Sequence, residues 1–178
     1  MACRMLKPLP MLFSIRPEHP SDLAAITTVT RDAFADHPKS SHTEHFIVNA
    51  LRNANALTVS LVAEAAGAVI GHVAVSPVQV AGAFQAWYGL GPVSVAPPQQ
   101  QQGVGSALIR AALAQLQTQG AGGCVLLGRP QYYHRFGFAP IAGLVLPGVP
   151  PDHFMGLAWR LPAPVGVVDY HDAFKATS

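Results

Sequence analysis

A short run of glutamines and glycines carries the clearest chemical signal in this sequence. The segment Gln100-Gln-Gln-Gly-Val-Gly105 follows an apolar stretch typical of a strand and precedes a stretch with helical spacing. Gly103 and Gly105 let the backbone approach a ligand closely. A helix start leaves several amide groups unpaired and carries a partial positive charge. The turn therefore predicts an anion site suited to a diphosphate.

The residues after the glycines exclude two other phosphate motifs. A P-loop requires Lys followed by Ser or Thr, and Ser106-Ala107 stands there instead. A dinucleotide fingerprint needs a small residue where Leu108 stands and an acidic residue about twenty positions later. Only apolar residues occupy that later region, 122–127. A glycine loop that merely opens a helix remains an alternative at this point.

A second segment, about thirty residues further on, narrows the choice. Tyr132-Tyr-His-Arg-Phe-Gly-Phe138 places a tyrosine four residues before Gly-Phe. Gln100, Gly103 and Gly105 fill the pattern Q/R-x-x-G-x-G/A. The two segments, in this order, resemble the two signatures of the GNAT superfamily of acyl-CoA N-acyltransferases. Together they are similar to its bacterial branch of predicted N-acetyltransferases.

Two further segments extend this resemblance from Phe13 to the end of the chain. Gly89-Leu-Gly-Pro-Val-Ser-Val95 resembles the splayed fourth strand of the family, and Val168-Asp-Tyr-His-Asp-Ala-Phe174 is similar to the tail of the bacterial branch. The resemblance implies an α/β fold with a central mixed, splayed β-sheet flanked by α-helices.

The resemblance also implies a set of cofactor-binding residues. The backbone around Ser94 would pair with the pantetheine arm as an added strand, and the amides of the turn would hold the pyrophosphate. Gln100 stands where the family often has Arg, so one charge-assisted contact is lost and affinity rests more on the backbone. The residues expected to bind acetyl-CoA are Val93, Ser94, Val95, Gln100, Gln101, Gln102, Gly103, Val104, Gly105 and Ser106.

Tyr133 is the candidate catalytic residue, because the family has a general acid at this place that protonates the departing CoA thiolate. A phenol with a pKa of about 10 stays protonated at neutral pH and can hydrogen-bond the sulfur as charge develops. The alternative is a buried aromatic side chain with a satisfied hydroxyl. The neighbouring Tyr132 has a smaller claim to the role. A backbone amide near Val93 would stabilise the oxyanion.

The acceptor amine must lose a proton before it attacks, so a base or a water relay is needed. The strand 86–95 contains no carboxylate. Each candidate is also an ordinary surface or packing group: Glu64, His72, Asp36, His37 and Glu44. Trp87 and Tyr88 either line the acceptor site or only pack the sheet.

The composition of the chain limits which classes of protein are compatible with these predictions. The chain has 178 residues, of which 50% are hydrophobic and 11% are charged, which is typical of one compact domain. The net charge of +2 comes with scattered Lys and Arg, so nucleic acid is not an expected partner. Cys3 and Cys124 form no disulfide framework, which favours a cytoplasmic protein. His42 and His45 lack a third ligand, so no metal is expected.

Hydrophobic spacing predicts the elements that position these residues. Residues 1–12 are too short for a membrane span and are expected to be a disordered extension of one N-acetyltransferase domain, 13–178. The strand, helix and strand around the glycine turn form a crossover, so the two strands should be parallel. Strands are predicted at 13–16, 57–64, 68–75 with an end at Pro77, 86–95, 124–127, 154–161 and 165–170. Glycine and proline inside 86–95 predict a bulge or splay in that strand. Helices are predicted at 22–33, 43–51, from the glycine turn to Gly120, and at 131–136.

The sequence thus predicts an N-acetyltransferase that moves the acetyl group of acetyl-CoA, by direct attack in a ternary complex, to a primary amine. The acceptor is a small molecule or a peptide, with no nucleic acid or membrane partner and a homodimer possible. A non-catalytic acyl-CoA-binding regulatory module is the alternative, motivated by the missing base and by Gln100. A longer acyl donor stays open as well.

Overall fold

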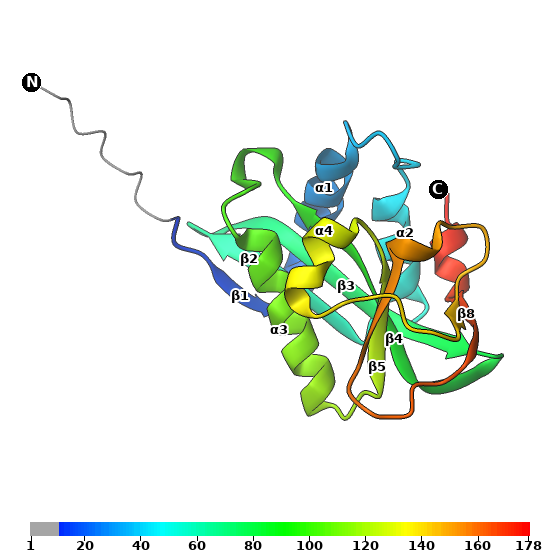
Figure 1. Ribbon diagram of the computed structural model, residues 1–178. Helices are drawn as coiled ribbons and strands as arrows, with labels where there is room; N and C mark the ends of the chain where they lie inside the picture. Colours follow the sequence, from blue (N-terminus) through cyan, green and yellow to red (C-terminus); the bar gives the residue numbers. More distant parts are fainter. Residues whose placement is uncertain (1–10) are drawn as a thin grey trace, which may run out of the picture.

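The computed structural model describes residues 11–178, which form one eight-stranded mixed sheet flanked by helices (Figure 1). The main strand order is β1-β2-β3-β4-β5-β7, while β8 pairs with β3 and β6 pairs with β8. The strands are β1 (Ser14–Pro17), β2 (Val59–Ala65), β3 (Ala68–Val80), β4 (Ala83–Val95), β5 (Gly123–Leu127), β6 (Leu144–Val145), β7 (Phe154–Ala158) and β8 (Gly166–Tyr170). The extension expected for 1–12 lies, up to residue 10, outside the described residues, as does Cys3.

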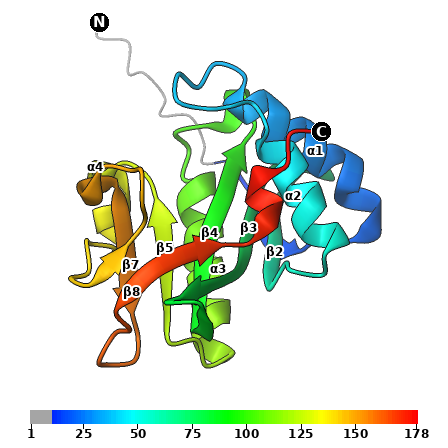
Figure 2. The same cartoon turned by 90° about the vertical axis from the view of Figure 1, so that its right-hand side faces the viewer.

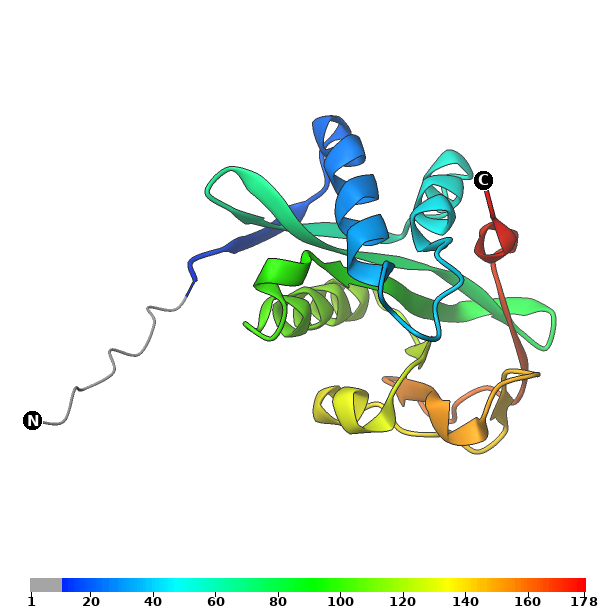
Figure 3. The ribbon, with the colours of Figure 1, turned by 90° about the horizontal axis from the view of Figure 1, so that it is seen from above.

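The longer helices cover the two faces of the sheet, with α1 and α2 on one face and α3 on the other (Figure 3). Each buries the apolar side chains whose spacing predicted it, such as Ile26 in α1, Leu51 in α2 and Ile109 in α3. The helices are α1 (Leu23–Phe34), α2 (Glu44–Asn53), α3 (Val104–Thr118) and α4 (Pro130–Tyr133). Short 3₁₀ turns are η1 (Pro20–Asp22), η2 (Pro97–Gln99), η3 (His134–Phe136), η4 (Pro151–His153) and η5 (Asp172–Lys175).

Strand β4 has two partner strands in its first half but only one in its second half, which creates the splay. Its first half runs parallel to β5, as the crossover predicts, but the register between them ends at Gly89 opposite Val125. On its other side, β4 stays paired with β3 up to Val95, with a register shift around Gly91-Pro92. The predicted bulge is therefore confirmed, and β4 and β5 separate just where it occurs.

The prediction that β3 ends at Pro77 is wrong, because the strand continues to Val80. The Val75 carbonyl accepts a hydrogen bond from the Thr58 amide, and the Ala81 amide donates to the Val167 carbonyl. The backbone N–H and C=O groups of the odd-numbered residues in this stretch therefore point to the side of β3 on which β2 and β8 lie. The register with β2 stops at Val75 and the register with β8 starts at Val78. Pro77 falls between those two partners, so its missing N–H leaves no ladder bond unmade.

The C-terminal segment closes over the α1–α2 face, an arrangement that the sequence did not predict. β8 pairs antiparallel with β3 through Val78↔Tyr170, and the 3₁₀ turn η5 that follows packs beside α2 (Figure 2). The ring of Phe174 lies 4.8 Å from that of Tyr170 between centroids. The last strand therefore carries Tyr170 back to the middle of the sheet.

A buried polar network joins α2 to the strands beneath it. Glu18 accepts hydrogen bonds from Arg52 at 2.7 Å and from the Ser60 hydroxyl at 2.5 Å. Because that hydroxyl proton is used, Nε2–H of His72 donates to the Ser60 oxygen, 2.8 Å away. His72 is fully buried, and burial lowers its pKa, so its imidazole is neutral.

The charge of Glu18 makes this network sensitive to acid. Burial by itself would raise the pKa of Glu18, but its interactions with Arg52, His72 and Ser60 outweigh burial and hold that pKa well below its ordinary value. A carboxylate with a depressed folded-state pKa stabilises the fold above its unfolded pKa of about 4.3. That contribution is lost as the pH falls from there through the folded-state pKa.

We expect Glu18→Gln to lower the free energy of unfolding by about 2 kcal/mol at pH 7, because Arg52 and the Ser60 hydroxyl lose a charged partner. The difference from the unchanged protein should shrink at pH 3, where the wild-type carboxylate no longer adds its full stabilisation. Urea unfolding at both pH values measures this. Asp172→Asn, at an exposed carboxylate, is the control and should change little. An equal difference at both pH values would contradict the assignment.

Candidate functional site

The second half of β4 offers a free backbone edge. The Ala96 amide donates to the Ile70 carbonyl at 2.9 Å, next to the paired residues Gly71 and Val95. In an antiparallel pair this pattern directs the peptide groups of Ser94 toward β3 and those of Val93 and Val95 away from it. Because the register with β5 ended at Gly89, the groups of Val93 and Val95 face the gap between the strands.

Ser94 lies differently from its two neighbours. Its side chain is buried on the α1 face, where its hydroxyl lies 3.1 Å from that of Thr30. The backbone of Ser94 pairs with His72. Val93 and Val95 instead pack their side chains against the core on the α3 side. Of the three strand residues expected to bind cofactor, Val93 and Val95 therefore present main-chain groups to the gap.

The predicted anion-binding turn lies directly after this edge. Gln101 and Gly103 adopt left-handed φ values of 61° and 87°, and α3 begins at Val104. The first helical bond of α3 runs from the Ala107 amide to the Gly103 carbonyl at 3.0 Å, and no side chain caps the helix. The amides of Val104, Gly105 and Ser106 therefore precede the first amide that donates within the helix, so they have no helical acceptor and can bind an anion.

Two glutamine side chains of the turn bind its own backbone. The Gln100 side-chain amide donates to the Val95 carbonyl at 3.1 Å, and that of Gln102 donates to the Pro98 carbonyl at 2.9 Å. The first bond ties the turn to the end of β4, and the second ties it to η2. Gln100 thus contacts the free edge, which its sequence pattern alone did not indicate.

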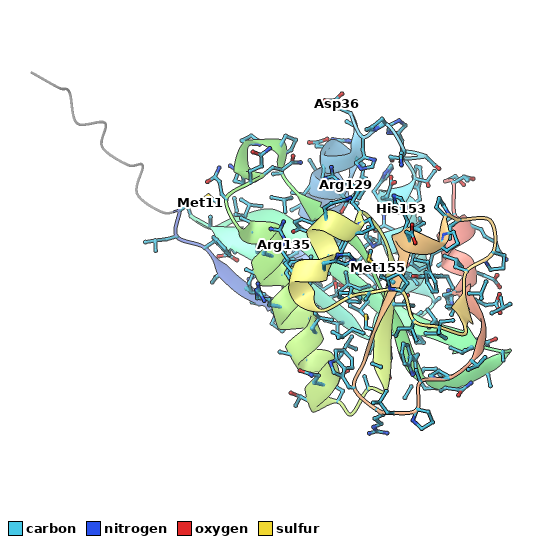
Figure 4. All side chains as sticks on the ribbon, viewed as in Figure 1. Met11, Asp36, Arg129, Arg135, His153 and Met155 are labelled. Carbon is cyan, nitrogen blue, oxygen red and sulfur yellow. The ribbon has the colours of Figure 1, made fainter. Side chains whose placement is uncertain are left out.

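Tyr132 lies over the first turn of α3. A Cβ atom added at Gly105 would lie 3.2 Å from the Tyr132 hydroxyl and 3.5 Å from a methyl group of Val95. The Arg135 guanidinium covers the Tyr132 ring, 4.7 Å from its centroid. Sequence reasoning gave Tyr132 a lesser place and missed Arg135, which lies in η3, while Arg129 directly precedes α4 (Figure 4). The Tyr132 hydroxyl therefore lies close to the turn, and the Arg135 guanidinium stacks on the same tyrosine ring.

Tyr133 is turned toward β5. Its ring lies flat against Gly128, where an added Cβ would lie only 2.3 Å from a ring carbon. Burial, with a smaller effect of Tyr132, raises the pKa of Tyr133 to about 12, although Arg129 opposes the shift. The hydroxyl therefore stays protonated at neutral pH and can act as a proton donor.

Two of the candidate bases take part in contacts elsewhere. Glu64 bonds the Arg16 guanidinium at 2.6–2.7 Å at the outer edge of the sheet. His72 belongs to the buried network around Glu18. These positions favour the packing alternative for both residues.

The other three candidates lie between α1 and α2. Asp36 and His37 are exposed, and Figure 4 places Asp36 at the outer tip of this segment. Glu44 accepts a hydrogen bond from Ser40 at 2.6 Å, while its second oxygen is buried without a partner among the described residues. Trp87 is buried under Gly123 in the sheet, which favours its packing alternative.

Metal sites and membrane-spanning helices are two further features that residues 11–178 could have contained. Within this range, no three His, Cys, Asp or Glu side chains gather closely enough to hold a metal ion, His42 and His45 included. Nor is any helix in the same range both long and apolar enough to cross a membrane. A groove of about 360 Å³ lies further along α3, between Arg110 and Trp159, and contains none of the turn residues.

Comparison with known proteins supplies the family. Residues 14–141 match the family described as "Acetyltransferase (GNAT) domain". The N-acetyltransferase YhbS of Escherichia coli is 38% identical over 125 residues, which are 70% of this chain and 72% of that protein.

Solved structures agree with this match. The GNAT family acetyltransferase of Brucella melitensis, in complex with acetyl-CoA, is 50% identical, has a TM-score of 0.83, and the match covers 92% of this chain and 98% of that one. The E. coli YhbS structure, in complex with CoA, is 33% identical with a TM-score of 0.85, over 98% of each chain. The fold, the two signatures and these relatives together show that the chain belongs to the GNAT family of N-acetyltransferases.

Proposed function

We propose that the protein transfers the acetyl group of acetyl-CoA to a primary amine of a small molecule or a peptide. The observation that carries the proposal is the juxtaposition of a free β4 edge, at Val93 and Val95, with the unpaired amides of the first turn of α3. The relatives solved with CoA and acetyl-CoA support the same donor.

The pantetheine arm would lie along Val93 and Val95 as an added strand. The diphosphate would accept hydrogen bonds from the amides of residues 101–106, at the positive end of α3. Both contacts use main-chain groups, so they depend on the path of the backbone more than on side-chain identity. The Arg135 guanidinium, which stacks on the Tyr132 ring whose hydroxyl lies close to Gly105, would favour the phosphates further.

The transfer itself needs one proton donor and one acceptor of a proton. The amine nitrogen attacks the thioester carbon, the new C–N bond forms, and the C–S bond breaks. The thiolate then takes its proton from Tyr133, and the Val93 amide stabilises the negative oxygen of the carbonyl. Water carries away the proton of the amine; Glu64 and His72 are engaged elsewhere, which leaves Asp36, His37 and Glu44 as the candidates to take it up.

Release of free CoA thiol from acetyl-CoA, measured with a panel of primary amines, tests the proposal. An amine-dependent rate that falls in Tyr133→Phe supports catalysis. Calorimetric binding of acetyl-CoA without any such rate would favour a non-catalytic acyl-CoA-binding module. Absence of acetyl-CoA binding would overturn the proposal.

Gln100→Arg should tighten CoA binding by about 5- to 10-fold, because a guanidinium at the turn adds a charge-assisted contact to the diphosphate. Gln100→Leu, a neutral change of similar size, is the matched control and should not tighten binding. Calorimetry at low salt measures the gain, which should shrink in about 0.5 M salt as charges are screened. An equal affinity of the Arg and Leu variants would show that this side chain lies away from the diphosphate.

A further inference from the structure

Tyr170 lies on the point at which β4 and β5 separate. It pairs with Val78 in β3, and its ring reaches across that strand to β4. A Cβ atom added at Gly89 would lie 2.4 Å and 3.0 Å from two carbons of the Tyr170 ring. Gly89 is also the residue at which the β4–β5 register ends. The ring therefore covers the inner end of the splay, and only a glycine there leaves it room.

The Tyr170 side chain packs against the buried cluster that contains Val125 of β5. Burial, followed by the nearby Cys124 thiol and Tyr133 hydroxyl, raises the pKa of Tyr170, so it is neutral. Cys124 belongs to β5, and Tyr133 packs on Gly128 just beyond that strand. Two tyrosine rings thus flank the gap: that of Tyr170 lies on Gly89 of β4, and that of Tyr133 lies on Gly128, directly after β5. The ring of Phe174 packs against the ring of Tyr170.

The proposed path of the cofactor leads to this place. An arm that pairs with Val95 and then Val93 runs toward Gly89, where the strands close and block further travel. On the α3 face the surroundings are filled by the buried core side chains of Leu90, Cys124 and Leu126. An acyl group at the end of the arm can therefore extend only toward the opposite face, which the Tyr170 ring covers.

We propose that the Tyr170 ring forms the end wall of the acyl site and restricts the donor to short acyl chains. This inference rests on the proposed function, because it needs an acyl-CoA in the splay. Tyr170 acts here as a specificity-determining residue through its bulk, and Tyr133 remains the proton donor. The C-terminal strand, through its distant pairing with β3, would thereby select the acyl group.

Calorimetric titrations with CoA, acetyl-CoA and hexanoyl-CoA test the proposal without requiring an acceptor amine. We expect the wild-type protein to bind acetyl-CoA at least about 10-fold more tightly than hexanoyl-CoA. Tyr170→Ala should reduce this ratio about 10-fold by opening the wall, with CoA affinity unchanged. Tyr170→Phe, the matched control, keeps the ring and should keep the wild-type ratio.

The outcomes separate this inference from the function on which it rests. Equal wild-type affinity for acetyl-CoA and hexanoyl-CoA would overturn it, as would an unchanged ratio in Tyr170→Ala, while CoA binding would leave the proposed function standing. Failure of the wild-type protein to bind CoA would overturn both. If Tyr170→Ala unfolds, Tyr170→Leu keeps apolar contact with Phe174 but is shorter, and it should lower the ratio in the same direction.

Discussion

Replacing Tyr133 by Phe should lower kcat for acetyl transfer by about 100- to 1,000-fold, the range expected when a positioned proton donor is removed. The phenyl ring still fits against Gly128, so the fold and the affinity for acetyl-CoA should be preserved. Steady-state kinetics with calorimetry of the same variant measures both quantities. A loss confined to KM would mean that Tyr133 contributes to binding and not to the chemical step.

Tyr132→Phe is the matched control for this prediction. Tyr132 is adjacent in sequence, but its hydroxyl lies over Gly105 at the start of α3. We therefore expect it to affect CoA affinity more than kcat. A larger loss of kcat in Tyr132→Phe than in Tyr133→Phe would exchange the two roles.

The pH profile gives a second view of Tyr133. A general acid must be protonated to act, and burial raises the pKa of Tyr133 to about 12. The activity lost through its ionisation should thus appear only as the pH approaches that value. We expect no alkaline fall due to this residue at pH 7–10. A fall centred near the ordinary phenol value of about 10 that vanishes in Tyr133→Phe would contradict the buried setting.

Substituting Gly105 by Val should weaken acetyl-CoA binding by about 10- to 100-fold. A Cβ at this position already approaches the Tyr132 hydroxyl and Val95, and two added methyl groups would occupy the space in front of the amides. The loss corresponds to one hydrogen bond to a charged group, about 1.5–3 kcal/mol. Gly105 lies inside α3, so the backbone tolerates a side chain, and the fold should remain.

Ser106→Ala is the control for Gly105→Val. It removes a hydroxyl from the same helix turn but leaves the amide in place, so binding through the main chain should be nearly unchanged. Calorimetry compares the two variants, and circular dichroism checks that α3 is retained. If Ser106→Ala costs as much as Gly105→Val, side chains rather than amides hold the diphosphate.

Local sequence patterns predicted the parts of the site that lie close together in the chain. The glycine turn, the start of α3 and the short helix at Tyr133 depend on residues a few positions apart, and they were found where the spacing indicated. The bulge at Gly91-Pro92 was also confirmed, because proline and glycine restrict a strand through local geometry. Their assembly into one site follows from the strand–helix–strand crossover.

Distant pairing explains what the sequence could not reveal. Pro77 ends a strand by local rules, but in the fold it falls in the gap between β2 and β8 and is tolerated. The contact between Tyr170 and Gly89 joins residues far apart in sequence, and hydrophobic alternation does not specify which strands become neighbours. The hydrogen bonds that Glu64 and His72 make likewise depend on partners in other elements.

The central claim is that the amides at the start of α3 bind the diphosphate of the acyl donor, and amide NMR during a CoA titration tests it most directly. We predict that the signals of Gly103, Val104 and Gly105 shift with CoA, and that pantetheine, which lacks the diphosphate, leaves them in place. Saturating CoA that shifts other residues while these three amides stay unchanged would contradict the account.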